Sequence, residues 1–198
     1  MKREEGTTAD YILEIVAPIF NRKGYVGTSL SDITEATQLT KGAIYCNFKN
    51  KEELALHAFH KNVDFVIHPM AQFIKEQHNA IDKLLAITNF YRNYYELASS
   101  RGGCPVLNVG IDAKHVNPIL YQATKEVVNR LITSLETIIE KGIQFGQLKT
   151  DINAKLVAGN IYAIIEGGIY LAMLHDDATY LHNVLDITEQ QIIQLKRD

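Results

Sequence analysis

Hydrophobic positions recur three and four residues apart along nearly the whole chain, and no segment of useful length alternates as a strand would. Because residues at these spacings share one face of a helix, the pattern predicts a protein built only of α-helices. The first helix is expected to end at Gly24, a residue that tolerates a left-handed backbone. Pro18 is expected to kink this helix, since its ring removes the bond to the Glu14 carbonyl.

Capping signals place the next two helices, which are both short. Ser29 can accept a backbone N–H while Asp32 reaches back three residues, an aspartate version of the capping box that predicts a helix over 30–37. A break follows, and Thr40 is suited to cap a second helix over 41–47. Two short helices with a tight connection are therefore expected near the N-terminus.

A long fourth helix is expected to follow. Asn50 and Glu53 repeat the capping-box pattern, and the apolar periodicity then continues towards residue 77. Pro69 lies inside this helix and predicts a bend near Phe65, whose carbonyl loses its hydrogen-bond partner.

The rest of the chain repeats the helical pattern, and 99–103 is the clearest loop. The further helices are expected at 80–98, 105–112, 118–146, 153–174 and 178–196. We expect one functional part over 1–66 and another over 67–198, joined within the long fourth helix and not by a flexible linker.

Composition is typical of a soluble globular protein, with 46% hydrophobic and 22% charged residues in a chain of 198. The N-terminus lacks the apolar run of a signal peptide. Cys46 and Cys104 are too few for a disulfide scaffold or a structural zinc site and are expected to be plain thiols. The longest apolar-rich stretch, 156–174, is interrupted by Asn160, Glu166, Gly167 and Gly168. A cytoplasmic protein without a membrane partner is expected.

The charge balance gives no general attraction to nucleic acid. The net charge is −3, and residues 1–66 contain eight Lys/Arg against nine Asp/Glu, which leaves −1. Any binding to DNA must therefore come from local charge. Between residues 40 and 51, Lys41, Lys49 and Lys51 occur without an acidic residue among them.

These features fit a helix-turn-helix, in which the second short helix enters the major groove while the first contacts the backbone. Its small core would consist of Leu30, Ile33, Leu39, Ile44 and Phe48. Gly42 would let a phosphate or a neighbouring backbone come close. The alternative is a small helical bundle that does not bind DNA.

The segments 24–33, GYVGTSLSDI, and 39–54, LTKGAIYCNFKNKEEL, resemble the DNA-binding signature of the TetR family, over about the first third of the chain. The resemblance implies an all-α protein whose three-helix N-terminal domain contains a helix-turn-helix at about 29–48. A long fourth helix then leads to a C-terminal domain for ligand binding and dimerisation. The resemblance further implies that Tyr45 and Lys51 contact phosphates.

The groove-facing residues are expected to be Thr40, Lys41 and Ala43. Cys46 departs from the family, where larger polar or aromatic residues are frequent, and a redox role for it is an alternative to an inert thiol. The DNA-binding residues expected in total are Ser29, Thr40, Lys41, Gly42, Ala43, Tyr45, Lys49 and Lys51.

The last two helices are expected to bind a second copy of the chain. Residues 153–174 are apolar on every face, and small residues at four-residue spacing would let another helix approach closely. The final helix has an apolar seam of alternating four- and three-residue steps. The alternative is ordinary packing within one subunit, whereas the resemblance implies a four-helix bundle in a homodimer. The expected interface residues are Gly159, Ala163, Gly167, Leu181, Leu185 and Ile192.

An aromatic-rich stretch at 90–95 and the segment 103–108 are candidates for an effector pocket. The latter resembles a segment in the C-terminal domain of one branch of the family. Apolar walls with a few polar groups would suit an organic ligand, although tyrosines also pack in cores or lie at surfaces. The expected lining residues are Phe65, Phe90, Tyr91, Tyr94, Leu107 and Asn108.

The function expected is that of a repressor released from a palindromic operator in double-stranded DNA by a small organic effector. A regulator that activates, or one without a small effector, is the alternative. No metal or cofactor is expected, because the histidine groups at 57–60 and 175–182 lack a full ligand set. No catalytic motif is present, and a rival helical enzyme would need His57, His60 or His115 as a base facing the pocket.

Overall fold

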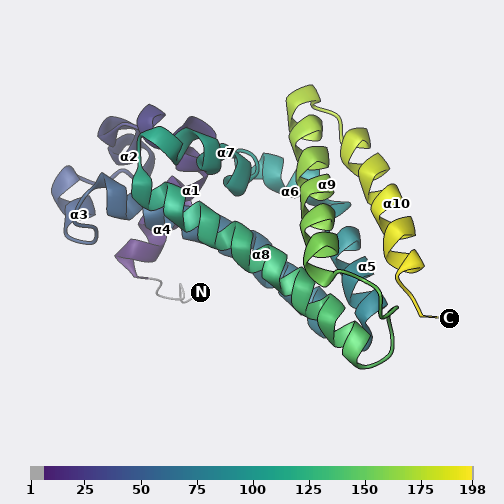
Figure 1. Cartoon of the computed structure of the whole chain (residues 1–198). Coiled ribbons are helices and arrows are strands. Elements are labelled where there is room, and N and C mark those ends of the chain that lie inside the picture. The colour runs from purple at the N-terminus through teal and green to yellow at the C-terminus, as the bar shows by residue number, and fades with distance from the viewer. Residues whose placement is uncertain (1–6, 198) are drawn as a thin grey trace, which may run out of the picture. The chain divides into compact units, whose positions relative to one another are not determined.

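The computed structural model describes residues 7–197, and the regular structure of that range is helical apart from one isolated β-bridge between Leu148 and Lys196. The all-α prediction is confirmed. The helices (Figure 1) are α1 Thr8–Gly27, α2 Leu30–Thr37, α3 Lys41–Tyr45, α4 Lys51–Lys75, α5 Ala80–Tyr91, α6 Tyr94–Ser100, α7 Pro105–Asp112, the 3₁₀ turn η1 Ala113–His115, α8 Pro118–Gln144, α9 Ala154–His175 and α10 Thr179–Gln194.

The first two capping predictions are confirmed. Ser29 Oγ accepts from the Asp32 N–H at 3.1 Å, and Asp32 Oδ2 accepts from the Ser29 N–H at 2.7 Å. Thr40 Oγ1 accepts from the Ala43 N–H at 3.2 Å and so begins α3. These bonds satisfy backbone donors that the first turn of a helix cannot pair internally.

The third cap differs from the expected capping box. Asn50 Oδ1 accepts from the Glu53 N–H at 2.8 Å, as predicted, but the Glu53 carboxylate accepts from the Lys49 N–H and not from that of Asn50. The helix still begins at Lys51, because one side-chain acceptor is enough to start the turn. α3 is also shorter than expected and ends at Tyr45.

Gly24 interrupts α1 at the position where the sequence predicted the end of the helix. Its backbone has φ 72° and ψ 174°, and the short turn after it belongs to α1 only across this kink. A Cβ here would lie 2.8 Å from a carboxylate oxygen of Asp112, which also accepts the Tyr25 N–H at 3.2 Å. Only glycine fits this positive φ and close approach.

The single helix expected over 80–98 is wrong, because α5 and α6 are separated at Arg92 and Asn93. The Arg92 carbonyl oxygen lies 2.9 Å from Nε2 of His182, and the Arg92 guanidinium pairs with Asp186 and Glu189 at 2.8 Å each. These contacts with α10 replace helical bonding at a point where neither Gly nor Pro signals a break.

α4 continues as one helix through Pro69. By its internal contacts the chain forms two compact units, which we describe separately. Unit 1 contains residues 1–65 and 100–125, and unit 2 contains residues 66–99 and 126–198. The predicted functional parts, 1–66 and 67–198, are continuous along the chain and so place 100–125 in the C-terminal part. Compact units do not test a division of function, and the functional division stays a prediction.

The polar contacts of unit 1 join α1 to the segment after α6. The Asn21 amide donates to the carbonyls of Arg101 (2.9 Å) and Gly103 (2.6 Å), and the Asn108 amide donates to those of Asn21 and Gly102 at 2.9 Å each. The Arg101 guanidinium also pairs with a carboxylate of α1 at 2.7 Å. This network fixes α7 against α1.

In unit 2, α9 and α10 pack side by side as a helical hairpin (Figure 1), and α10 also packs on α5. Leu181, Leu185 and Ile192 are fully buried within the chain. The apolar seam of α10 therefore faces inward. α9 is long and apolar enough to cross a membrane by length and composition, a test that the core helix of a soluble protein also passes.

Candidate nucleic-acid interface

The helix-turn-helix is formed by α2 and α3, with Gln38 as its turn. Gln38 has φ 55° and ends α2 in the left-handed region. Of the five core residues expected, Ile33, Ile44 and Phe48 are buried, whereas Leu30 and Leu39 are half-buried. The buried residues fix the packing of the two helices in unit 1.

α3 presents polar and small residues to the outside of unit 1. Lys41 and Gly42 are exposed, and Ala43 and Tyr45 are partly so. A Cβ on Gly42 would meet only Thr40 Oγ1 at 3.9 Å, so no neighbouring backbone in the described chain requires a glycine. Packing within the described residues therefore does not explain the glycine at this position.

Lys51 is held at the start of α4 by an aromatic ring. Its ammonium nitrogen lies 4.5 Å from the ring centroid of Tyr25, a cation–π contact. Partial burial lowers the pKa of Lys51, an effect that the charge of Asp32 opposes. Lys51 is also the first residue of α4, and the N-terminus of a helix favours an anion.

A second lysine braces the same region. Lys23 Nζ lies 2.6 Å from Asp32 Oδ1, and this hydrogen bond, together with those from Ser29, holds the pKa of Asp32 well below its usual range. Sequence reasoning missed both Lys23 and Tyr25 as parts of the site. The signal was weak, because Tyr25 lies within the family-like segment but nothing in the sequence joins it to Lys51.

The remaining predicted DNA-binding residues belong to the same stretch of unit 1. Ser29 and Thr40 are exposed cap residues, and Lys49 is exposed with only a loose 4.0 Å pair to Glu53. Tyr45 lies with its ring centroid 5.9 Å from the ammonium of Lys41. These side chains offer hydroxyl and ammonium donors, which are among the groups that contact phosphate oxygens and base edges.

The six residues predicted for an effector pocket fall into two groups. Phe90, Tyr91 and Tyr94 form an aromatic cluster in unit 2, with ring centroids 5.7 Å and 5.1 Å apart along the series. Tyr91 also lines a small apolar cavity with Met70 and Ile165, among others. The remaining three, Phe65, Leu107 and Asn108, belong to unit 1.

The six residues predicted for a dimer interface also divide. The three on α10 are buried within the chain, whereas Ala163 and Gly167 on α9 are exposed and Gly159 is partly so. A Cβ on either Gly159 or Gly167 would meet nothing within 4 Å. The face of α9 opposite its packed side is exposed at Leu156, Asn160, Ala163, Gly167, Tyr170 and Leu174.

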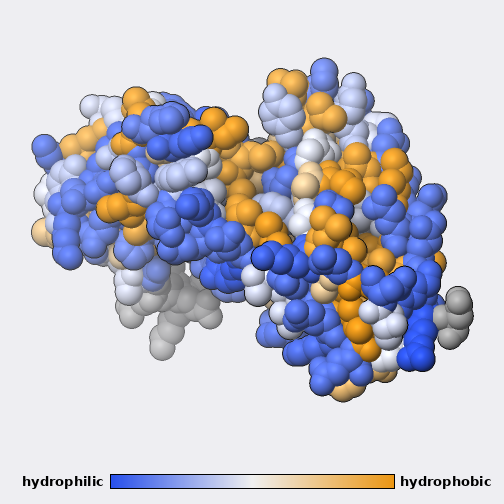
Figure 2. All heavy atoms as spheres, in the orientation of Figure 1, coloured by the Kyte–Doolittle hydropathy of each residue, from blue (hydrophilic) through white to orange (hydrophobic). Residues whose placement is uncertain are grey.

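This exposed series on α9 steps by four and three residues, which is the spacing of a helix-packing seam. Figure 2 shows hydrophobic surface over the region of α9 and α10.

Among the residues described, no group of three His, Cys, Asp or Glu is placed to hold a metal ion. Cys46 is exposed and Cys104 is buried.

A capped helix-turn-helix with exposed basic and small residues, in an otherwise helical chain, defines a DNA-binding regulator of the helix-turn-helix class. Family models agree with both parts of the chain. Residues 12–58 match the bacterial regulatory proteins of the tetR family, and residues 80–188 match the tetracyclin repressor-like C-terminal domain. The chain belongs to the TetR family of transcriptional regulators.

Solved structures share the whole fold. A TetR-family regulator from Cytophaga hutchinsonii is 34% identical with a TM-score of 0.88, covering 98% of this chain and 100% of that one. A second, from Chloroflexus aurantiacus, is 33% identical with a TM-score of 0.90 and 96% of each chain covered. A curated relative, the fatty acid metabolism regulator protein of Bacillus subtilis (strain 168), is 23% identical over 83% of each chain.

Proposed function

We propose that this regulator is a cytoplasmic homodimeric repressor, which binds a near-palindromic operator in double-stranded DNA and leaves it when a small organic effector binds. The observation that supports it best is the pairing of two exposed surfaces, the polar surface of α3 and the apolar stripe of α9. The first suits DNA, and the second suits a copy of the same helix. No catalytic role is proposed.

Operator binding is proposed to need both surfaces. Two recognition helices must meet the major groove about one turn of DNA apart, about 34–36 Å, and only a dimer supplies two. The α9 stripe, from Leu156 to Leu174, offers small residues at Ala163 and Gly167, so that a partner helix can approach closely. Tyr170 and Leu174 extend the same stripe with apolar area.

Release from the operator is proposed to depend on α4, which begins with Lys51 in the proposed DNA-binding part and ends at Lys75 in the proposed effector-binding part. An effector that favours a different position of this helix would shift the two reading heads away from the operator spacing. Linkage makes the effect reciprocal, so operator must lower effector affinity by the same factor that effector lowers operator affinity. A hundred-fold factor would correspond to about 2.7 kcal/mol.

The test is an electrophoretic titration of a selected operator at several salt concentrations, combined with sedimentation of the free protein. A dimer that binds the operator with a steep salt dependence is expected, because phosphate contacts release counterions. A monomer at micromolar concentration, or binding that ignores operator sequence, would contradict the proposal. For a regulator without an effector, operator affinity would be the same in the presence and absence of every compound tested.

A further inference from the structure

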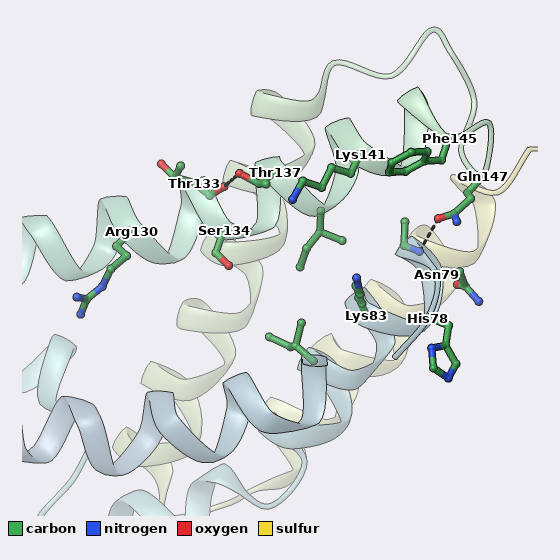
Figure 3. A pocket seen from close by; sticks show the side chains of 14 residues that line it. His78, Asn79, Lys83, Arg130, Thr133, Ser134, Thr137, Lys141, Phe145 and Gln147 are labelled. Carbon is green, nitrogen blue, oxygen red and sulfur yellow. Dashed lines mark hydrogen bonds between the residues drawn. The ribbon is translucent and has the colours of Figure 1, made fainter. Parts of the chain in front are cut away.

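Unit 2 contains a cleft of about 470 Å³ between the end of α4, the start of α5 and one face of α8 (Figure 3). This volume falls within the range of about 300–1,000 Å³ that small-molecule sites occupy. The family-like motifs do not involve the cleft, and none of the predicted effector residues lines it. It is therefore an independent candidate for the effector site.

The lining of the cleft is basic. Lys83, Arg130, Lys141 and His78 all line it, and no Asp or Glu does. In the part of the chain that the structure describes, none of the ion pairs includes Lys83, Arg130 or Lys141. Three uncompensated cations around one hollow, in a protein of net charge −3, favour an anionic ligand.

The basic side chains come from opposite walls. Lys83 extends from α5 and Lys141 from α8 towards the space between these helices (Figure 3). Ser134 adds a hydroxyl on the α8 wall. By contrast, the Ala80 N–H at this end of α5 already donates to Gln147 Oε1 at 2.8 Å and is not left for a ligand.

The cleft also has an apolar side. Ile74 and Ser134 line both this cleft and the small apolar cavity that contains Met70, Ile87 and Tyr91. The apolar cavity has a volume of about 30 Å³, which is too small for a hydrocarbon chain. An apolar chain entering it must displace side chains, and the flexible Met70 on α4 is suited to move.

From these observations we infer that the cleft binds an amphiphilic anion. The carboxylate or phosphate head lies between Lys83 and Lys141, and the hydrocarbon part enters past Ile74 towards Tyr91. The inference rests on the proposed effector response and specifies the chemical class of the effector. Entry of the chain beside Met70 would act on α4, the helix that begins with Lys51.

Four probes of equal chain length test the charge requirement: decanoate, decyl phosphate, decanol and decylamine. Decanol is used below its solubility limit and the other three below their critical micelle concentrations. Binding to the full-length protein is measured by calorimetry and thermal shift. Decanoate or decyl phosphate should bind, and comparison of the two identifies the preferred head group. Equal binding of decanol or decylamine would overturn the inference, as would the absence of binding by both anions.

Variants test the location. Lys83→Met and Lys141→Met should each weaken anion binding by about ten-fold, since each removes a charged partner. Lys75→Met, at the end of α4 but outside the lining, is the matched control and should bind as the wild type does. Unchanged affinity in Lys83→Met and Lys141→Met would overturn the location.

Operator titration with and without decanoate separates this inference from the proposed function. Lysine-dependent anion binding supports the inference whether or not DNA is released, and failure of release then counts against the effector response alone. If another compound releases the operator while neither anion binds, the inference is wrong and the proposed function stands.

Discussion

α3 and α9 each present a face that no other described residue covers, but the chemistry of the two faces is opposite. α3 exposes Lys41 and Gly42 beside its polar cap Thr40, whereas α9 exposes leucine, tyrosine and small residues in a stripe in which Asn160 is the one polar residue. A charged surface is stable in water, while a contiguous apolar one gains free energy by meeting a partner. Exposure alone therefore says little, and the kind of side chain indicates the kind of partner.

Adjacent glycines make the contrast sharper within α9. A Cβ on Gly167 would meet nothing within 4 Å, whereas one on Gly168 would collide with the Val184 side chain of α10. One residue therefore tests an external contact and its neighbour tests internal packing. Gly42 on α3 resembles Gly167 in this respect, because its only neighbour is Thr40 Oγ1 at 3.9 Å.

The largest effect is expected from Gly167→Leu, which adds bulk to the open face of α9 without a clash inside the chain. The variant should stay helical but sediment as a monomer and bind operator about 10²–10⁴-fold more weakly, because the second reading head is no longer linked to the first. Gly168→Leu should instead destabilise the subunit itself. A Gly167→Leu variant that stays dimeric would remove this face from the interface.

The next largest effect concerns Glu166, which shares α9 with the apolar stripe. Burial raises its pKa from the ordinary value of 4.5 to about 7, although a hydrogen bond with Tyr162 lowers it. Since the folded state disfavours the charged form, the wild type should lose stability as pH rises from about 4.5 through 7. Glu166→Gln should lack this loss and be more stable at pH 8 by up to about 3 kcal/mol.

Urea unfolding at pH 5 and pH 8, at one fixed protein concentration, measures the effect of Glu166→Gln. The difference between the variant and the wild type should be large at pH 8 and small at pH 5. In Tyr162→Phe the pH-dependent loss of stability should extend to higher pH than in the wild type, because the variant lacks the hydrogen bond that favours the Glu166 carboxylate. A difference that does not change with pH would contradict the burial of this charge.

A smaller effect, confined to DNA binding, is expected from Lys51→Ala. Loss of one phosphate contact should weaken binding by about ten-fold for all sequences alike and lower the salt slope by about one unit. Tyr25→Leu should share part of the loss, because it removes the ring under the Lys51 ammonium. Tyr25→Phe retains an aromatic ring and should bind operator as the wild type does. Unchanged titrations at several salt concentrations would exclude Lys51 as a phosphate contact.

The smallest effect is expected from Gly42→Ala, for which stability and binding should change in opposite directions. Alanine should stabilise α3 by up to about 1 kcal/mol, since its neighbourhood is open and glycine is a poor helix former. Operator binding should fall by a few-fold if DNA approaches Gly42 closely. Thermal melting and operator titration of the same variant measure both, and equal or tighter binding would show that this glycine does not serve DNA contact.

The sequence alone determined where most helices begin and that the N-terminal part contains a helix-turn-helix. Ser29 and Thr40 act through their own backbone neighbours, so their roles could be predicted without knowledge of distant residues. The break at Gly24 was also predicted, but its close approach to Asp112 was not. Tertiary contacts decided the division of 80–98 into α5 and α6, because Arg92 is held by residues of α10 that the sequence does not connect to it.

Tertiary structure also decided which apolar face turns inward. α9 is apolar all round, so its periodicity could not distinguish the packed side from the stripe that contains Gly167, and the regular seam of α10 proved to be the inward one. The basic cleft could not be predicted from the sequence either. Lys83, Arg130 and Lys141 form no motif along the chain, and only the packing of α5 and α8 around a common space brings them to one site.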